Sequence, residues 1–288
     1  MSEKKINFGD NNITIKEFDF NTMVNCPTIG LIAKRRTGKS FICRALLNHY
    51  KKVTSGVIIS PTESDTMTPF YNGFFPDSFI HDKYSSELMQ TIINRQKGLV
   101  DKLKIKYKQG KYFDPRLILL MDDCLADVSS WGKDPLISTL FLNGRHLNIT
   151  LILTMQFLKG ITPALRSNFD YIFLLAENNT ASKEKLYKEF GGIFSSKEIF
   201  YQIFDKLTDN YGCMVINNAS NSSNISDIVF HYKAPDFKGV KLDEFGGRQI
   251  KTFDKKNYDK NYKNKIKSVD LRQYGTKKNK PIIGVNKI

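Results

Sequence analysis

The stretch TIGLIAKRRTGKSFICRALL, residues 28–47, decides the fold. Its first six residues, TIGLIA, are mostly apolar and predict a buried strand. Residues 39–52 have apolar side chains at helical spacing and predict a helix. Between these two elements, Gly38-Lys39-Ser40 completes most of the pattern G-x-x-x-x-G-K-[ST], which is typical of a phosphate-binding loop. The order strand, turn and helix is the setting in which such a loop works.

The loop predicts binding of ATP together with Mg²⁺. In such a loop, backbone N–H groups hold the phosphates, the lysine contacts the β- and γ-phosphates, and the hydroxyl binds Mg²⁺. The start of the helix adds a site that favours negative charge. Ala33 stands where the pattern has its first glycine, which is tolerable if the φ angle of Ala33 is negative. The predicted nucleotide-binding residues are Lys34, Arg35, Arg36, Thr37, Gly38, Lys39 and Ser40, and Ser40 is also a predicted metal ligand.

Two acidic residues follow a second apolar run, RLILLMDDC at 116–124. Asp122 then lies at the C-terminal end of a buried strand, where it can bind Mg²⁺. Asp123 can orient or deprotonate the attacking water. Adjacent carboxylates repel each other unless a cation compensates them, although both could simply be turn residues.

A third apolar run, ITLILTMQ at 149–156, ends in Gln156. An uncharged amide at this position can contact both the γ-phosphate and the attacking water. Arg145 precedes this run and Arg166 precedes the next one, YIFLLAE at 171–177. Arginine can stabilise charge on a transferring phosphoryl group, often from a neighbouring subunit, but either arginine could equally form a surface ion pair.

The pattern along the chain predicts an α/β fold. Apolar runs with little polar alternation indicate strands of a parallel sheet that is covered on both faces. Residues 84–108 have apolar side chains at helical spacing, which predicts a long amphipathic helix. A β-rich or irregular segment is expected for residues 1–25, and an edge strand at 228–232. Besides the three runs above, strands are expected at 56–60, 78–82, 171–177 and 213–217.

The composition points to a polyanionic partner. The chain has 288 residues and a formal net charge of +15, which favours nucleic acid or an anionic membrane surface over a neutral partner. From residue 250 to 288 there are twelve lysines and arginines against three aspartates, so 12 − 3 gives +9. This end is too polar to build a core of its own. The helix at 84–108 and its exit are also basic, with Arg95 and six lysines against one acid, Asp101, from residue 95 to 111. Either this segment or the C-terminal one could be a solvated face.

Several classes of protein are disfavoured. The four cysteines lie far apart without metal-ligand spacing, so they are expected to be buried thiols. The start MSEKKINFGD resembles no signal peptide, and the apolar runs are too short to cross a bilayer. We therefore expect an intracellular protein without a transmembrane segment.

Several blocks of sequence, in this order, resemble the genome-packaging ATPases of nucleocytoplasmic large DNA viruses, the poxvirus-type branch of the FtsK–HerA superfamily. The resemblance covers roughly residues 18–180. The blocks are FDFNTM, PTIGLIAKRRTGKSFICRALLNHY, VIISPTESD, FYNGFFPDSFI, LILLMDDC, FLNGRHLNITLILTMQ and ITPALRSNFDYIFLLAEN. The departures from the family pattern are Ala33 and the pair Arg35-Arg36 inside the loop.

The resemblance implies a RecA-like P-loop ATPase core and a homo-oligomeric ring, expected to be a hexamer. It implies ATP-driven movement of double-stranded DNA into a capsid, with capsid or inner-membrane proteins of the virion as further partners. The expected location is the viral assembly site in the host cytoplasm, and the virion. By position, Lys39 and Ser40 bind phosphate and Mg²⁺, Asp122 holds the metal, Asp123 stands where many relatives have a catalytic Glu, and Gln156 is the sensor.

The expected organisation is a lead-in at 1–25, an ATPase core at 26–235 with a basic helical insertion at 84–112, and a basic C-terminal extension at 236–288. Two alternatives to a packaging motor stay open. One is another FtsK–HerA-like DNA translocase or helicase, which acts in replication or segregation. The other is a nucleotide-gated scaffold that binds DNA or capsid without turnover, against which the presence of both Asp123 and Gln156 argues.

Overall fold

The computed structural model describes residues 3–8, 11–63, 70–124, 132–156, 161–237 and 239–258. The chain divides into two compact units. Unit 1 consists of residues 1–46 and 152–241, and unit 2 of residues 47–151 and 242–288. Each unit is therefore built from segments that are distant in the sequence.

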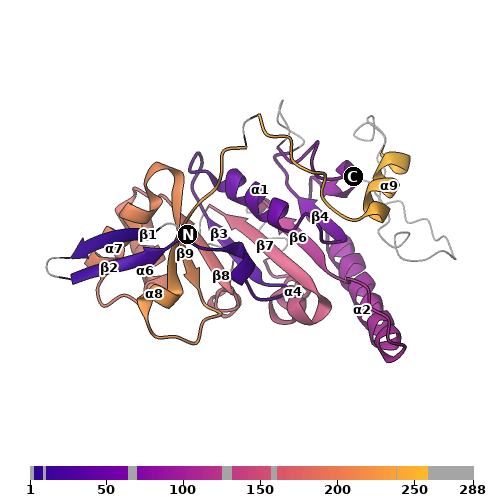
Figure 1. The fold of residues 1–288 in the computed structure, drawn as a ribbon, viewed down its shortest axis with the longest axis horizontal. Helices are drawn as coiled ribbons and strands as arrows, with labels where there is room; N and C mark the ends of the chain where they lie inside the picture. The colour runs from indigo at the N-terminus through magenta and orange to yellow at the C-terminus, as the bar shows by residue number, and fades with distance from the viewer. Residues whose placement is uncertain are drawn as a thin grey trace. The chain divides into compact units, whose positions relative to one another are not determined.

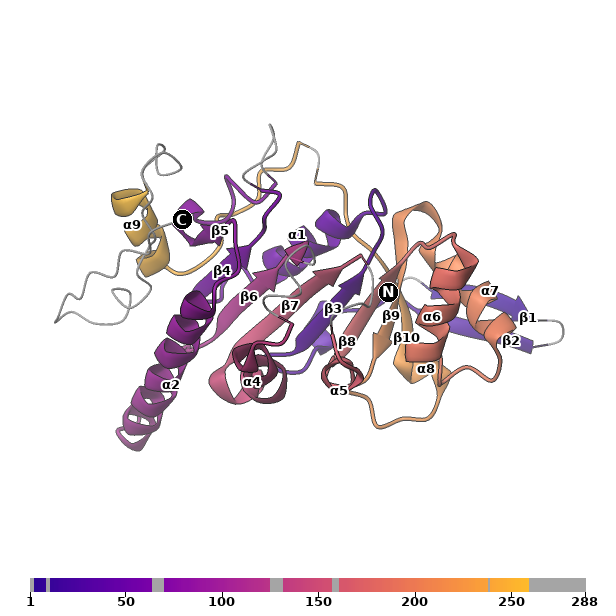
Figure 2. The same cartoon turned by 180° about the vertical axis from the view of Figure 1, so that it is seen from behind.

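Unit 1 begins with an antiparallel pair of strands and continues into a layered α/β structure. Phe18, which follows the pair, packs against the rings of Tyr171, Phe173 and Phe230 at centroid distances of 5.4, 5.8 and 5.5 Å. Figure 2 shows α6 and α7 side by side, and α7 packs against β9. The main elements of unit 1 are β1 (Glu3–Phe8), β2 (Asn11–Lys16), β3 (Thr28–Ile32), α5 (Pro163–Arg166), β8 (Tyr171–Leu175), α6 (Thr180–Phe190), α7 (Lys197–Thr208), β9 (Gly212–Asn217), α8 (Ile225–Ile228) and β10 (Val229–Lys233).

Unit 2 contains the remaining strands and the longest helix, α2, which extends away from β4 in Figure 1. Its main elements are β4 (Ser55–Ile59), β5 (Ile80–His81), α2 (Ser86–Lys108), β6 (Leu117–Met121), α4 (Pro135–Asn143) and α9 (Arg248–Asn257). Two elements run through the border between the units, namely α1 (Lys39–His49) and β7 (Ile149–Met155).

The central sheet has eight strands in the order β10-β9-β8-β3-β7-β6-β4-β5. Strand β3 is parallel to β8, and β4 is parallel to both β5 and β6, whereas β9 is antiparallel to β8 and to β10. All residues of β3, β4, β6, β7 and β8 are buried, which requires cover on both faces of these strands. The predicted α/β fold with a mainly parallel sheet is confirmed, and so is the edge strand β10.

The first part of the predicted C-terminal extension packs onto unit 2. Phe245 is buried and stacks on Phe75 with ring centroids 4.6 Å apart. This stack lies over Gly56 of β4, where a Cβ atom would come within 2.6 Å of the Phe245 ring. Residues 242–258 thus add to an existing core instead of building one. The basic stretch 259–288 lies outside the described residues.

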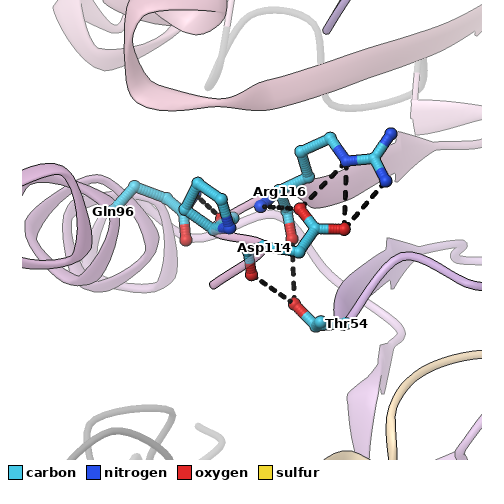
Figure 3. Close-up of polar contacts among 5 residues, drawn as sticks. Thr54, Gln96, Asp114 and Arg116 are labelled. Carbon is cyan, nitrogen blue, oxygen red and sulfur yellow. Dashed lines mark hydrogen bonds and ion pairs between the residues drawn. The ribbon is translucent and has the colours of Figure 1, made fainter. Parts of the chain in front are cut away.

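A partly buried polar cluster around Gln96 of α2 joins this helix to the chain that enters β6 in unit 2 (Figure 3). Gln96 is fully buried, and its amide donates to the carbonyl oxygens of Pro115 and Leu147 at 2.9 and 2.8 Å. Asp114 forms a bidentate ion pair with Arg116, and Thr54 donates to the Asp114 carbonyl oxygen at 3.2 Å. These contacts satisfy polar groups where the chain enters β6, so the helix base and the strand are held together.

Candidate nucleotide-binding site

The phosphate-binding loop follows β3 in unit 1, as the sequence predicted. Residues 33–38 form the turn, and α1 begins at Lys39. The Gly38 carbonyl oxygen accepts hydrogen bonds from the N–H groups of Phe41 and Ile42, so Gly38 stands at the helix N-terminus. Thr37 is buried, and its hydroxyl donates to the Lys34 carbonyl oxygen at 2.8 Å. The turn is therefore closed by its own hydrogen bonds.

Backbone angles explain which positions of the loop need glycine. Gly38 has a φ of 99°, a conformation that side chains with a Cβ adopt only with strain. Arg36 also lies in the left-handed region, with a φ of 65°. Ala33 is not among the described residues with positive φ, so this position does not require glycine. The unusual alanine thus leaves the shape of the loop intact.

Within unit 1, the end of β7 lies beside the start of the loop. The N–H group of Ala33 donates to the carbonyl oxygen of Met155 at 2.9 Å, and Gln156 follows directly. The Lys34 ammonium lies 4.0 Å from the carboxylate of Glu177, which follows β8. Unit 1 therefore brings together the residues 33–40, Gln156 and Glu177. Glu177 was not predicted, and its position after a buried strand is its only signal in the sequence.

In unit 2, Asp122 follows β6 and is buried, with 5% of its surface exposed. Its N–H group donates to the Ile59 carbonyl oxygen, and its carboxylate accepts a 2.7 Å hydrogen bond from the Tyr71 hydroxyl. Asp123 is only partly buried and has a φ of 56°, the left-handed conformation that is uncommon outside glycine. The two neighbouring acids are thus held differently: Asp122 by buried hydrogen bonds, Asp123 by a strained turn.

Glu63, after β4 in unit 2, is a second buried acid. Its carboxylate accepts hydrogen bonds from the N–H groups of Phe70, Tyr71 and Asn72 at 2.9, 2.6 and 3.0 Å. Three N–H donors satisfy the hydrogen-bonding capacity of this buried carboxylate. Because Tyr71 also contacts Asp122, Glu63 fixes the backbone that positions the Asp122 partner. Neither Glu63 nor Tyr71 was predicted to belong to the site.

Each of the two candidate arginines precedes a strand, whereas the loop and Asp122 follow strands. Within its own unit, each arginine therefore lies at the opposite end of the strands from the other candidate site residues. Arg145 is exposed and precedes the start of β7, beside the start of β6, where Leu117 donates to the Asn148 carbonyl oxygen. Arg166 precedes β8, and its guanidinium donates to Glu189 at 2.8 Å and to the Ile161 carbonyl oxygen at 2.6 Å. Arg145 is therefore not close to Asp122 within unit 2, and Arg166 is not close to the loop within unit 1.

The basic helix α2 is confirmed, but one of its cations points inward. Arg95 donates to the Ser55 hydroxyl at 2.8 Å and to the Gln96 side chain at 2.5 Å, so we do not count it as a phosphate contact. Beyond Gln96 no described residue of α2 is buried. The exposed lysines of this part are Lys97, Lys102, Lys104 and Lys108.

Two further expectations concern cysteines and membranes. All four cysteines are buried thiols, as predicted. Among the described residues, no helix is both long and apolar enough to span a membrane. No group of three or more His, Cys, Asp or Glu side chains in the described ranges could hold a metal ion. A nucleotide-bound Mg²⁺ needs no such group, because it takes most of its ligands from phosphate and water.

Comparison with solved structures finds similar chains of low sequence identity. The genome-packaging NTPase B204 from Sulfolobus turreted icosahedral virus 2, in complex with AMPPCP, is 16% identical, with a TM-score of 0.47. The match covers 74% of this chain and 100% of that chain. The cytoplasmic domain of the type VII secretion ATPase EccC from Thermomonospora curvata is 14% identical, with a TM-score of 0.48, and the match covers 78% of this chain and 27% of that one.

Relatives by sequence are viral proteins, while no family model matches the chain. The uncharacterized protein 088R of Invertebrate iridescent virus 3 is 34% identical over 218 residues, which are 75% of this chain and 78% of that protein. The uncharacterized protein L437 of Acanthamoeba polyphaga mimivirus is 42% identical over 280 residues, which are 96% of each chain. The chain therefore belongs to the family of viral proteins that includes L437 of this mimivirus and 088R of this iridescent virus.

Proposed function

We propose that the protein is an ATP-hydrolysing motor that moves double-stranded DNA, and that it packages a viral genome into the capsid at the site of virion assembly. The observation that carries the proposal is the phosphate-binding loop of unit 1. The loop joins a buried strand to α1, has glycine at the left-handed position next to the helix, and lies beside the end of β7, which Gln156 follows directly.

In this proposal, residues 34–40 bind the phosphates of ATP, and Ser40 and Asp122 hold Mg²⁺. A carboxylate as buried as Asp122 needs compensation by hydrogen bonds or a cation, and Tyr71 supplies one hydrogen bond. Mg²⁺ would supply positive charge at this carboxylate and at the phosphates. Asp123 and Gln156 then act on the attacking water, Asp123 as an acceptor of its proton and Gln156 as a hydrogen-bonding amide. Convergence of the two groups of residues on one nucleotide is part of the proposal.

Membership of a viral family favours genome packaging over chromosome segregation in a cell. The exposed lysines of α2 and the charge of +15 supply the phosphate contacts that movement along DNA of any sequence requires. Two adjacent acids at a strand end, one of them in a left-handed turn, favour a hydrolytic enzyme over a scaffold without turnover.

The test is ATP hydrolysis by the full chain with and without linear duplex DNA. We expect hydrolysis that DNA stimulates and that Lys39→Ala or Asp122→Asn each abolish. Lys52→Ala is the matched control, since this exposed lysine lies outside the loop. Hydrolysis that survives both changes at the site would contradict the assignment.

DNA contact by α2 has a separate test. The double change Lys102→Glu and Lys108→Glu is expected to remove most of the stimulation by DNA and leave DNA-free hydrolysis intact. The double change Lys185→Glu and Lys197→Glu, at exposed positions of α6 and α7, is the charge-matched control. Equal loss of stimulation in the control would mean that net charge alone, and not α2, determines DNA binding.

In the proposal, Arg145 and Arg166 act between neighbouring subunits of a ring. Because Arg145 and Arg166 lie away from the loop and from Asp122 within their own units, either one would act on the nucleotide of a neighbouring subunit. Mixing Arg145→Ala or Arg166→Ala subunits with Lys39→Ala subunits should then restore part of the turnover at mixed interfaces. If neither mixture recovers activity, this assignment fails, and the contacts of Arg166 with Glu189 and the Ile161 carbonyl oxygen are then structural.

A further inference from the structure

A pocket of about 540 Å³ opens beside the phosphate-binding loop, entirely within unit 1. Arg36 and Thr37 of the loop form one of its walls. The residues after β8, including Asn178, form another, and the turn between α7 and β9, with Asp209 and Tyr211, forms a third. Because β8 is parallel to β3 and antiparallel to β9, these three segments meet at one edge of the sheet.

Tyr211 is held at this pocket in an unfavourable conformation. Its φ is 61°, and that of Asn210 is 49°, so two successive residues other than glycine lie in the left-handed region. Each such residue costs roughly 1–2 kcal/mol. The Tyr211 side chain is 64% exposed, so burial of its ring does not offset this cost. A strained, exposed aromatic residue at a pocket is typical of a ligand site.

The ring is also close to the loop itself. A Cβ atom placed on Gly38 would lie 3.7 Å from both Cβ and Cδ1 of Tyr211. A ligand whose phosphates occupy the loop could therefore extend its other end over the tyrosine ring. The pocket walls add amide and carboxylate groups, of which Asp205 is already paired with Lys183 at 2.6 Å.

We propose that this pocket is the nucleoside subsite, with the base stacked on Tyr211 and the ribose hydroxyls facing the polar wall that includes Asn178 and Asp209. This inference rests on the proposed function, because it takes the phosphates of the same ligand to be bound by the loop. Stacking on a single ring accepts any base but favours the larger purines. We therefore expect purine nucleotides to bind more tightly than pyrimidine nucleotides.

The test compares two ligands that differ only in the nucleoside. MgATP and Mg-tripolyphosphate are titrated calorimetrically against the full chain without DNA. Loss of one stacked base costs about 1–3 kcal/mol. Tyr211→Ala should therefore weaken ATP binding about tenfold and leave tripolyphosphate binding unchanged. Tyr211→Phe, which keeps the ring, should bind ATP far more tightly than Tyr211→Ala, and Tyr107→Ala removes an exposed tyrosine of α2 as a control.

Each outcome separates this inference from the function on which it rests. Unchanged ATP binding by Tyr211→Ala would overturn the proposed nucleoside subsite. It would not affect the proposal that the loop binds phosphate, which Lys39→Ala tests separately. Equal weakening of ATP and tripolyphosphate would also overturn it, because Tyr211 would then support the loop rather than the base. If Lys39→Ala affects the binding of neither ligand, the proposed function itself fails.

Discussion

The two units hold their candidate site residues in different ways. In unit 1 the backbone shapes the site: Arg36 and Gly38 take left-handed conformations, and a helix begins at the end of the turn. In unit 2, side chains position the candidate residues. The Tyr71 hydroxyl donates to the Asp122 carboxylate, and the Glu63 carboxylate accepts hydrogen bonds from three backbone N–H groups. A site made by the backbone leaves a spacing pattern in the sequence, whereas a site made by distant side-chain partners does not. The predictions below test this difference.

Gly38→Ala should have the largest effect, because it acts on the backbone-built part. At a φ of 99° an alanine is strained, and a distorted loop would lose phosphate contacts. We expect ATP affinity to fall about a hundredfold, equivalent to roughly 2.7 kcal/mol. Gly98→Ala is the matched control, since an added Cβ there meets no atom within 4 Å. Similar affinities in the two variants would show that the loop does not depend on glycine geometry.

Glu63→Ala tests the side-chain-built part through stability. The change leaves three N–H groups without their acceptor, so we expect the free energy of unfolding to fall by about 2 kcal/mol. Urea denaturation measures it. Glu184→Ala, which removes an exposed surface pair with Lys188 on α6, should lower the free energy of unfolding far less than Glu63→Ala does. If Glu63→Ala costs no more than this control, the buried acid does not organise the turn.

Tyr71→Phe asks whether the hydroxyl on Asp122 matters for turnover. Loss of one hydrogen bond to a buried carboxylate should cost about 1–2 kcal/mol, equivalent to roughly a tenfold lower kcat if the contact orients the metal ligand. Tyr84→Phe removes the equivalent bond, from Tyr84 to Asp134, which lies outside the site. It should lower stability and leave kcat unchanged. Equal kcat values in the two variants would remove Tyr71 from the site.

Asp77→Asn should have the smallest effect, and one that depends on pH. Burial, together with the nearby carboxylates of Asp254 and Glu63, raises the pKa of Asp77 from 3.8 to about 6. The folded state therefore holds a proton more tightly than the unfolded state, so Asp77 lowers stability as pH rises from about 4 to 6. Allowing for solvent screening, Asn should stabilise unit 2 by at most about 1 kcal/mol above pH 6 and by little at pH 4. Urea midpoints at the two pH values measure it, and an equal gain at both would contradict the assignment.

The sequence predicted the strands well, because nearly continuous apolar runs are strong signals. It did not predict that β9 runs antiparallel to β8, since a strand buried on both faces has the same composition in either direction. The acids Asp122 and Asp123 and the loop could be found because they follow strands directly. Tyr71 could not, because its partner lies 51 residues further along the chain. Arg95 was counted among the basic residues of α2, since helical spacing alone does not show that Ser55 and Gln96 draw it inward.

The cluster around Gln96 has a mechanical consequence for α2. One face of the first half of α2, with Met89, Ile92, Ile93 and Gln96, is buried in unit 2. The following residues, to Lys108, extend about 18 Å further at 1.5 Å per residue. The helix therefore acts as a rigid lever arm, and a tilt of about 10° at its anchored end sweeps its lysine-rich tip through about 3 Å. Any small rearrangement between β4 and β6, the strands next to the buried part of α2, would therefore produce a larger displacement of the lysine-rich end of this helix.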